Sequence, residues 1–517
     1  MKSKNVLLGM AGVAMFSSGA MAQKPANIIL INLDDSGNGD FSCRGAIGYQ
    51  TPHIDWMAAN GMSMNNFYAV QPISGASRAG LMTGCYPNRI GFAYALNPGS
   101  PYGISEQEET VAELLRDKGY ATAIFGKWHL GDEKKFLPLQ HGFDEYYGLP
   151  YSNDMWPFHP QYKFPDLPLI KGNDIIGYNT DQTRLTTDYT NYAVDFIHRN
   201  VNKPFFLYLA HSMPHVPLAV SDKFKGKSEL GLYGDVMMEL DWSIGEILRT
   251  IREEGIEDNT LVILTSDNGP WANYGNHAGS SGGLREAKAN TFNGGTRVPC
   301  FFYWKGKIPP ASVCNNVYSN IDILPTLVEI SGAKMPKLKI DGVSMLPTLT
   351  VDPTIAARKY LCFYYHKNSL EAITDGRYKL VFPHKYVSYD GQVPGNDGLP
   401  GELGEGEVKE CELYDLRRDM GERVNVISQH PEVVKDLTRE AEVWRDELGD
   451  DLTGRQGKAR REAGKSVKAA KKIQLVGYGW IRCALFHWFR SEIIACVVDV
   501  EFPFFFHGKC GGGGFVS

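Results

Sequence analysis

The sequence lacks the cysteine spacings that bind zinc or build a disulfide scaffold. Its nine cysteines are scattered over 517 residues, and no two of them form a Cys-x-x-Cys pair. One or two disulfides remain compatible with an oxidising compartment. Blocks of like charge are also missing. The net charge of −6 is spread along the chain, so the composition does not indicate a nucleic-acid partner.

The apolar stretch at the N-terminus is shorter than a membrane span. Lys2 and Lys4 precede the apolar residues 6–16, and the sequence Ala-Met-Ala follows at residues 20–22. A basic start, a short apolar segment and a small-x-small site are typical of a cleaved signal peptide. We therefore expect a signal peptide over residues 1–22, a periplasmic or secreted mature protein, and no transmembrane anchor.

The composition present is that of a folded globular protein, with 43% hydrophobic and 22% charged residues. A chain of this length exceeds one small core, so we expect two domains, over residues 23–350 and 351–464. Residues 465–517 differ from both, because a basic start leads into aromatic and apolar residues that charged residues interrupt too often for a membrane span. We predict that they form an atypical tail without a catalytic role.

Four apolar segments are typical of buried strands in a parallel sheet. Residues 27–33, NIILINL, are almost continuously apolar, as expected for a strand covered on both faces. Helical patterns alternate with these segments, so we predict an α/β fold with a large mixed, mostly parallel sheet flanked by helices. The other predicted strands cover residues 120–125, 204–210 and 260–264, and the helices cover residues 110–116 and 236–251.

Shorter apolar runs predict a smaller C-terminal α+β domain. Residues 360–364 and 378–382 fit the strands of an antiparallel sheet. Residues 431–448 predict a helix that packs near the end of this domain.

Polar residues follow each predicted strand of the large sheet. Because ligands of open α/β sheets bind beyond the carboxyl ends of the strands, we expect these side chains to meet. Asp34 and Asp35 are adjacent and repel each other unless a cation lies between them, and oxygen ligands favour a hard ion such as calcium or magnesium. The same strand ends supply Lys127, His129, His215, Asp267 and Asn268, and Lys288 follows in a loop.

A metal ion faced by several cationic side chains is suited to a tetrahedral oxyanion. Such a site neutralises the charge of the substrate and stabilises the transition state, so sulfate and phosphate esters are the candidate substrates. Each residue alone has an ordinary interpretation, because most lysines are simply solvated and most single histidines are structural. Their joint occurrence after predicted strands favours a functional site.

Residues 74–78, SGASR, precede an apolar run and predict a loop that leads into a helix. Ser77 is a candidate N-cap, at a helix end that favours anions. Without context, the ordinary interpretation of Ser74 is a solvent-facing serine before an ordinary helix.

The sequence resembles the sulfatases of the alkaline-phosphatase superfamily, most closely the arylsulfatase and carbohydrate-sulfatase branch. The resemblance spans about residues 26–464, with the blocks in family order. These blocks are NIILINLDDSGNG at 27–39, TPHID at 51–55, SGASR at 74–78, LMTG at 81–84, GKWHLG at 126–131, PH at 214–215, SDNG at 266–269, NIDILPT at 320–326, DGVS at 341–344 and ELYDL at 412–416.

The resemblance implies that Ser74 is oxidised to formylglycine (3-oxoalanine). The hydrate of formylglycine attacks sulfur with one hydroxyl and eliminates sulfate with the help of the other, whereas a plain serine would end as a stable ester. A serine at this position implies a Ser-type radical sulfatase-maturing enzyme as a partner. The resemblance also implies one calcium ion per chain, and the implied ligands are Asp34, Asp35, Asp267, Asn268 and the formylglycine at position 74.

The resemblance assigns roles to the cationic residues as well. Arg78 would hold the formylglycine, and His129 would take a proton as the hydrate collapses. Lys127 and Lys288 would bind sulfate oxygens, with Lys288 or His215 as the proton donor to the leaving group.

The substrate implied by the resemblance is a sulfated carbohydrate. Ser152 stands where the family has a serine beside the sulfate. Asp154, Trp156 and His159 follow and are suited to gripping a sugar. The implied activity is hydrolysis of a sulfate ester, for example on galactose or N-acetylhexosamine units of a polysaccharide or glycosaminoglycan.

Two other functions are compatible with parts of this pattern. A phosphatase or phosphodiesterase of the same superfamily would use threonine or serine directly with two zinc ions, but the ligands here suffice for one metal. A catalytically inactive glycan-binding homologue would result if Ser74 stayed unmodified. Two positions depart from the family pattern, Cys85 in place of an arginine and Asn293 in place of a frequent glutamate.

Overall fold

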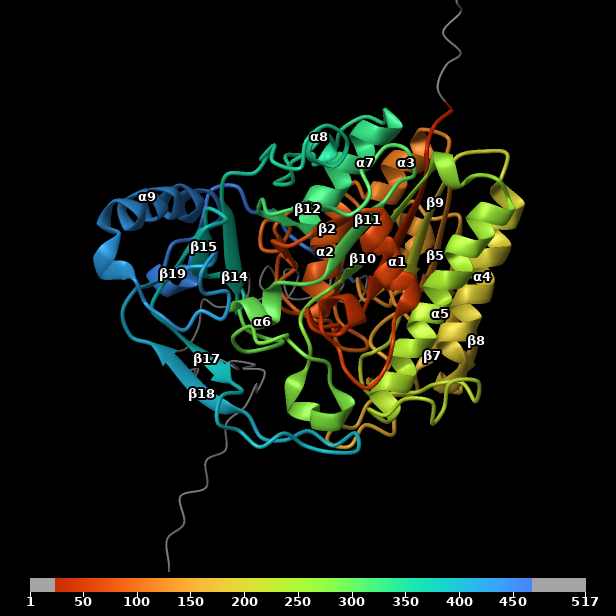
Figure 1. Cartoon of the computed structure of the whole chain (residues 1–517), viewed down its shortest axis with the longest axis horizontal. Coiled ribbons are helices and arrows are strands. Elements are labelled where there is room, and N and C mark those ends of the chain that lie inside the picture. The colour runs from red at the N-terminus through yellow and green to blue at the C-terminus, as the bar shows by residue number, and fades with distance from the viewer. Residues whose placement is uncertain (1–23, 467–517) are drawn as a thin grey trace, which may run out of the picture. The chain divides into compact units, whose positions relative to one another are not determined.

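The described part of the chain, residues 24–466 of a computed structural model, is built on a ten-stranded mixed sheet (Figure 1). The strand order is β12-β2-β11-β10-β1-β9-β5-β6-β7-β8, and the five strands from β10 to β6 are parallel. The predicted mixed, mostly parallel sheet is confirmed. The strands are β1 (Asn27–Leu33), β2 (Met62–Met64), β5 (Ala121–Gly126), β6 (Glu145–Gly148), β7 (Pro168–Lys171), β8 (Asp174–Tyr178), β9 (Phe205–Ala210), β10 (Thr260–Ser266), β11 (Cys300–Tyr303) and β12 (Ser312–Cys314).

Helices cover both faces of this sheet, which explains why its central strands are mostly apolar on both faces. All seven residues of β1 are buried, with Ile28 and Leu30 on one face and Ile29 and Ile31 on the other. Since neighbouring residues of a strand point to opposite faces, each face needs its own cover. The first face packs against α2 (Ser74–Thr83), α3 (Val111–Asp117), α7 (Ile323–Ser331) and α8 (Leu346–Thr350), and the second against α1 (Pro52–Asn60), α4 (Leu185–Asn200) and α5 (Leu232–Glu253).

A smaller antiparallel sheet follows near the C-terminal end of the described chain, as predicted. Its order is β14-β15-β16-β19, and α9 (Pro431–Leu448) packs on it through Leu437, Ala441 and Leu448. The strands are β14 (Leu361–Tyr365), β15 (Ser369–Thr374), β16 (Tyr378–Val381) and β19 (Glu412–Asp415). A separate hairpin pairs β17 (His384–Ser388) with β18 (Gly404–Val408).

The predicted signal peptide and most of the predicted tail lie outside the described residues. Gly464 and Lys465 form β20, which pairs with β4 (Tyr102–Gly103). Across residues 24–466, no helix combines the length and the apolar character that crossing a membrane requires. The six cysteines of this part are all free thiols.

Gly126 ends β5 and pairs with Ala210 at the end of β9. Its φ angle is +125°, and a Cβ atom there would lie 1.8 Å from the carbonyl oxygen of Ala210. We predict that Gly126→Ala lowers the free energy of unfolding by at least about 2 kcal/mol, because the backbone next to Lys127 must shift. The matched control is Gly119→Ala, where φ is +97° but no atom lies within 4 Å. This control should cost about 1 kcal/mol, and equal losses in thermal unfolding would contradict the prediction.

Candidate active site

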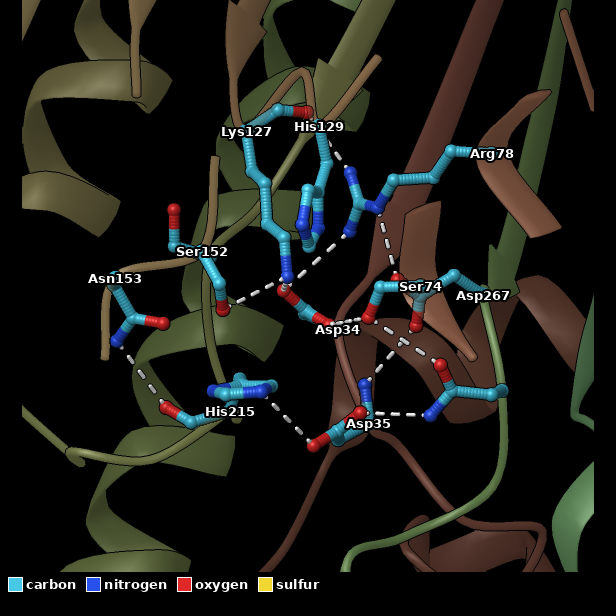
Figure 2. A network of polar contacts seen from close by, with 12 residues as sticks. Asp34, Asp35, Ser74, Arg78, Lys127, His129, Ser152, Asn153, His215 and Asp267 are labelled. Atoms are coloured by element: carbon cyan, nitrogen blue, oxygen red, sulfur yellow. Dashed lines mark hydrogen bonds and ion pairs between the residues drawn. The ribbon is translucent and has the colours of Figure 1, made fainter. Parts of the chain in front are cut away.

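Four adjacent parallel strands bring the predicted site residues to one edge of the large sheet. Because β10, β1, β9 and β5 are neighbours in that order, their carboxyl ends lie side by side. Figure 2 shows side chains from these ends converging around Ser74. The residues that follow the strands are Asp34 and Asp35 (β1), Lys127 and His129 (β5), His215 (β9), and Asp267 and Asn268 (β10).

Ser74 is the first residue of α2 and is almost completely buried. Its Oγ atom lies 3.0 Å from Asp34 Oδ1 and 3.3 Å from Asn268 Oδ1 (Figure 2). The prediction that Ser77 caps the helix is wrong, because the helix begins three residues earlier and the Ser77 hydroxyl instead accepts a hydrogen bond from Asn320 Nδ2 at 2.8 Å. Ser74 itself therefore occupies the helix start, where free N–H groups favour negative charge.

Arg78 lies buried between two carboxylates. Its Nε donates to Asp267 Oδ2 at 2.9 Å, Nη2 lies 3.6 Å from Asp34 Oδ2, and Nη1 donates to the carbonyl of Lys127 at 2.9 Å. Burial and the neighbouring Asp34 carboxylate nevertheless raise the pKa of Asp267 to about 6. The buried Asp267 carboxyl is therefore easier to protonate than an exposed one, although Arg78 contacts it directly.

Lys127 supplies a second cation to the same oxygen of Asp34 that Arg78 faces. Its Nζ lies 2.5 Å from Asp34 Oδ2 and donates to Ser152 Oγ at 3.1 Å. Burial alone would raise the pKa of Asp34, but Lys127, His215, Arg78 and Lys288 together hold that pKa well below its usual value. The Asp34 carboxylate is therefore ionised despite its burial.

Asp35 gathers three further groups. The Asp35 carboxylate lies 2.8 Å from Lys288 Nζ, 3.5 Å from His215 Nε2 and 2.7 Å from Asn268 Nδ2. His215 Nδ1 donates to the Val216 carbonyl at 2.5 Å, so its Nε2 is the ring nitrogen that faces the site. Asp35 has a φ angle of +65°, a left-handed conformation that costs about 1 kcal/mol and directs its carboxylate toward these groups.

His129 is held as a neutral imidazole with one free ring nitrogen. Its Nε2 lies 3.1 Å from the carbonyl of Leu96, and because a carbonyl only accepts, Nε2 carries the proton. Nδ1 has no hydrogen-bond partner within residues 24–466. Burial, Lys127 and Arg78 hold the pKa of His129 well below its usual value. Nδ1 can therefore act as a proton acceptor.

The donor atoms fit a hard metal ion. Asp34, Asp35 and His215 offer ligand atoms that lie within 4.8 Å of one another, and all three residues are buried. Asp267 Oδ1 accepts the backbone N–H of Asp35 at 3.2 Å, and Asn268 contacts both Ser74 and Asp35. Carboxylate and amide oxygens without a thiolate are the donor set of calcium or magnesium.

Asp154, predicted to bind substrate, lies beside His159, which the sequence also placed next to the sugar. Its Oδ2 lies 3.8 Å from His159 Nε2, and its Oδ1 has no hydrogen-bond partner in the part of the chain that the structure describes. Asn153, to which the sequence assigned no role, donates to Gln182 Oε1 at 3.0 Å and to the His215 carbonyl at 3.4 Å. No spacing signal predicts these contacts, because the partners are 29 and 62 residues away in the chain.

The two departures from the family pattern lie outside this cluster. Cys85 is buried, and its Sγ lies 3.3 Å from Arg461 Nη2. The backbone N–H of Asn293 donates to Glu422 Oε2 at 2.7 Å, and Glu422 also pairs with Lys379 at 2.8 Å. Residues distant in the sequence thus supply the guanidinium beside Cys85 and the carboxylate beside Asn293.

The geometry around Ser74 combines a buried hydroxyl, oxygen donors that suit a hard cation and several cationic side chains, a set that suits esters of tetrahedral oxyanions. Comparison with known proteins specifies the class further. The chain belongs to the sulfatase family, which matches residues 26–333, and is a sulfuric ester hydrolase. The C-terminal region of aryl-sulfatase matches residues 357–465, and the C-terminal part of N-sulphoglucosamine sulphohydrolase matches residues 287–390.

Relatives with known names support this membership. The chain is 35% identical over 470 residues to N-acetylgalactosamine-6-sulfatase of Mus musculus, covering 85% of this chain and 89% of the mouse protein. It is 33% identical to N-acetylgalactosamine-6-O-sulfatase of Bacteroides thetaiotaomicron, and the alignment covers 81% of this chain and 93% of the Bacteroides protein. The structure of a Pseudoalteromonas sp. sulfatase aligns with a TM-score of 0.73 at 27% identity, covering 81% of this chain and 90% of that one.

Proposed function

We propose that this protein hydrolyses the 6-sulfate ester of N-acetylgalactosamine units in a sulfated glycan. The observation that carries the reaction is the position of Ser74, whose Oγ lies at a helix start within hydrogen-bonding distance of Asp34 and Asn268. The substrate is inferred from the mouse and Bacteroides relatives, both of which are named for sulfate at position 6 of N-acetylgalactosamine.

In this proposal a Ser-type radical sulfatase-maturing enzyme oxidises Ser74 to formylglycine. As its hydrate, residue 74 would supply one hydroxyl to attack sulfur and a second one to expel the sulfate. The neutral His129, with its free Nδ1, accepts the proton of the second hydroxyl. Arg78, held by Asp267, fixes the position of residue 74 on the first turns of α2.

The proposed metal is one calcium ion, which would neutralise the carboxylates and polarise a sulfate oxygen. Oxygen donors of Asp34, Asp35, Asp267 and Asn268 converge at the ends of β1 and β10. The residues that would hold the ion are Asp34, Asp35, Asp267, Asn268 and the modified residue 74.

The sulfate group would lie among the cations that surround Ser74. Lys127, fixed by Asp34 and Ser152, and Lys288, fixed by Asp35, neutralise its oxygens. Burial lowers the pKa of Lys288, but Asp35 and its neighbouring carboxylates raise it above its usual value, so this lysine stays protonated. Lys288 or His215 would donate the proton that turns the leaving ester oxygen into a hydroxyl.

The sugar would contact the segment that follows Ser152. Asp154 is mostly buried and keeps one carboxylate oxygen without a partner in the described chain, which suits a sugar hydroxyl. Trp156 packs edge-to-face on Phe158 at 4.9 Å between ring centroids, and the Phe158 side chain is 70% exposed. Exposed aromatic faces favour the apolar face of a sugar ring.

We further propose the division into a catalytic domain (residues 23–350) and a C-terminal subdomain (residues 351–464), with export to the periplasm or outside of the cell. The family matches over residues 26–333 and 357–465 support this division. The charged and short apolar start of the chain supports export.

A panel of sulfated sugars tests the proposed function. The protein is co-expressed with a Ser-type maturing enzyme and incubated with the 6-sulfate and 4-sulfate of N-acetylgalactosamine, the 6-sulfate of N-acetylglucosamine and 4-nitrophenyl phosphate. We expect kcat/KM for N-acetylgalactosamine 6-sulfate to exceed the other values at least about tenfold. A substrate that leaves one buried polar group of the site unpaired loses about 1–3 kcal/mol of binding free energy in the transition state. A preference for another sulfate position would refute the substrate, and faster phosphate release would refute the reaction.

A further inference from the structure

The loop that carries Lys288 makes hydrogen bonds with Ser388 and Tyr389, about 100 positions further along the chain. These two residues stand at the end of β17 and at the start of its connection to β18, residues 389–403, which we call the C-terminal hairpin connection. Glu286 Oε1 accepts a hydrogen bond from Ser388 Oγ at 3.0 Å, and Glu286 Oε2 accepts one from the Tyr389 N–H at 2.8 Å. The Tyr389 hydroxyl returns to donate to the Lys288 carbonyl at 2.8 Å. Glu286, Tyr389 and Lys288 are thus joined in a closed set of contacts.

The backbone of this loop needs external support. Glu286, two residues before Lys288, has a φ angle of +58°, and Ala289, directly after it, one of +67°, so both adopt the left-handed conformation. Neither residue is a glycine, and such conformations persist only where the surrounding structure holds them. The contacts made by Ser388 and Tyr389 supply that support at the first of the two positions.

The other side of the loop contacts the active-site segments directly. The Lys288 N–H donates to the Pro270 carbonyl at 2.9 Å, two residues beyond Asn268. The Ala289 N–H donates to the Pro72 carbonyl at 2.9 Å, two residues before Ser74. The loop therefore lies between the C-terminal hairpin connection and the segments that present the nucleophile and the metal ligands.

Lys288 depends on the position of this loop for its own contacts. Its Nζ lies 2.8 Å from the Asp35 carboxylate and 4.3 Å from the centre of the Trp271 ring. Because these two contacts fix Nζ, a displacement of the loop backbone by about 1 Å forces the lysine stem into another rotamer or moves the ammonium group away from Asp35.

We propose that Glu286 is a positioning residue for Lys288, acting with Tyr389 to hold the loop in the conformation that presents the ammonium group to the sulfate. This inference rests on the proposed role of Lys288 in binding sulfate. It gives the C-terminal part of the chain a function in catalysis, because Ser388 and Tyr389 contact the loop that carries Lys288.

The first test removes the carboxylate. Glu286→Ala, co-expressed with the maturing enzyme and assayed on 4-nitrophenyl sulfate as well as on N-acetylgalactosamine 6-sulfate, should lose kcat/KM by about ten- to a hundredfold. Glu286→Gln keeps one acceptor for the Tyr389 N–H and should recover most of this loss. The matched control is Asp397→Asn, a carboxylate of the same hairpin connection that contacts Asn276 instead of the Lys288 loop and should leave kcat/KM unchanged.

A double-mutant cycle separates positioning from general damage to the fold. If Glu286 acts through Lys288, then Glu286→Ala should cause no further loss in a Lys288→Ala background. An equal loss in both backgrounds, or full activity of Glu286→Ala beside an impaired Lys288→Ala, would overturn the positioning role alone. Full activity of Lys288→Ala would instead contradict the proposed function of that lysine, and the positioning role with it. Should Glu286→Ala fail to fold, Tyr389→Phe takes its place, because it removes only the hydroxyl that contacts the Lys288 carbonyl. It is then compared alone and combined with Lys288→Ala in the same way.

Discussion

Ser74→Ala is expected to abolish sulfate release, with kcat/KM falling by at least about 10⁵-fold, the loss that follows removal of a catalytic nucleophile. The substitution removes one buried hydroxyl that contacts Asp34 and Asn268 and leaves the helix start intact. Thermal unfolding should therefore change little. Sulfate release from 4-nitrophenyl sulfate and N-acetylgalactosamine 6-sulfate, measured on the same samples as the unfolding curve, checks both halves of the prediction.

The matched control for this change is Thr83→Ala in the same helix. The Thr83 hydroxyl is also buried, but it donates to the Ala79 carbonyl at 2.7 Å and lies at the opposite end of α2. Its removal should leave kcat/KM within about threefold of the unaltered protein, since only a local hydrogen bond is lost. A similar fall in both variants would place the effect of Ser74→Ala in the fold of the helix.

Expression of the unaltered chain without a maturing enzyme is a second test of the role of Ser74. It should fold normally and show as little turnover as Ser74→Ala, because an unmodified serine cannot release its sulfate ester. Mass spectrometry of the peptide across Ser74 should show a loss of two hydrogens only when the maturing enzyme is present. Normal turnover by a chain that keeps an unmodified serine would refute the formylglycine assignment.

Arg78→Ala is expected to lower the free energy of unfolding by about 3–5 kcal/mol, the range found when one partner of a buried ion pair is removed. The guanidinium is fully buried, 2.9 Å from Asp267 and 3.6 Å from Asp34. Without it, Lys127 alone faces the Asp34 carboxylate, and the Asp267 carboxylate loses its paired cation. Thermal or urea unfolding of the metal-free protein measures the loss.

The control for this change is Arg249→Ala, an arginine that also pairs with two carboxylates but lies on the surface of α5. Arg249 contacts Glu246 at 2.6 Å and also pairs with Glu253, and its side chain is about half exposed. Exposed pairs contribute at most about 1 kcal/mol, so this variant should be nearly as stable as the original. Added calcium should restore part of the stability of Arg78→Ala, because a bound cation compensates the same carboxylates. No difference between the two variants would contradict the assignment of Arg78.

Local patterns predicted much of the architecture correctly. The helix expected over residues 431–448 is α9 within the same bounds, and the apolar residues 27–33 form β1. These predictions succeeded because apolar periodicity reports which faces of an element are covered, wherever the covering elements come from. The cap expected at Ser77 failed, because the helix begins at Ser74 and the hydroxyl of Ser77 is bound by Asn320.

In the candidate site, too, the sequence predicted some features and not others. Asp34, Lys127 and Asp267 could be chosen from the sequence, since each follows a strand-like segment and belongs to a block of the sulfatase family. The contacts of Asn153 with His215 and of Glu286 with Tyr389 could not, because the partners are 62 and 103 residues apart and no local signal joins them.

The sequence by itself determined the class of fold, the family and the identity of the residues that can carry charge at the strand ends, because these depend on residue type and local order. Only the tertiary structure decided which charges meet. The order β10-β1-β9-β5 places Asp34 and Asp267 on either side of Arg78. The surrounding fold leaves Nδ1 of His129 without a partner among residues 24–466, and the separate β17–β18 hairpin brings Tyr389 to the backbone of Lys288. Electrostatic and hydrogen-bond energies depend on distances across the fold, which local sequence patterns do not specify.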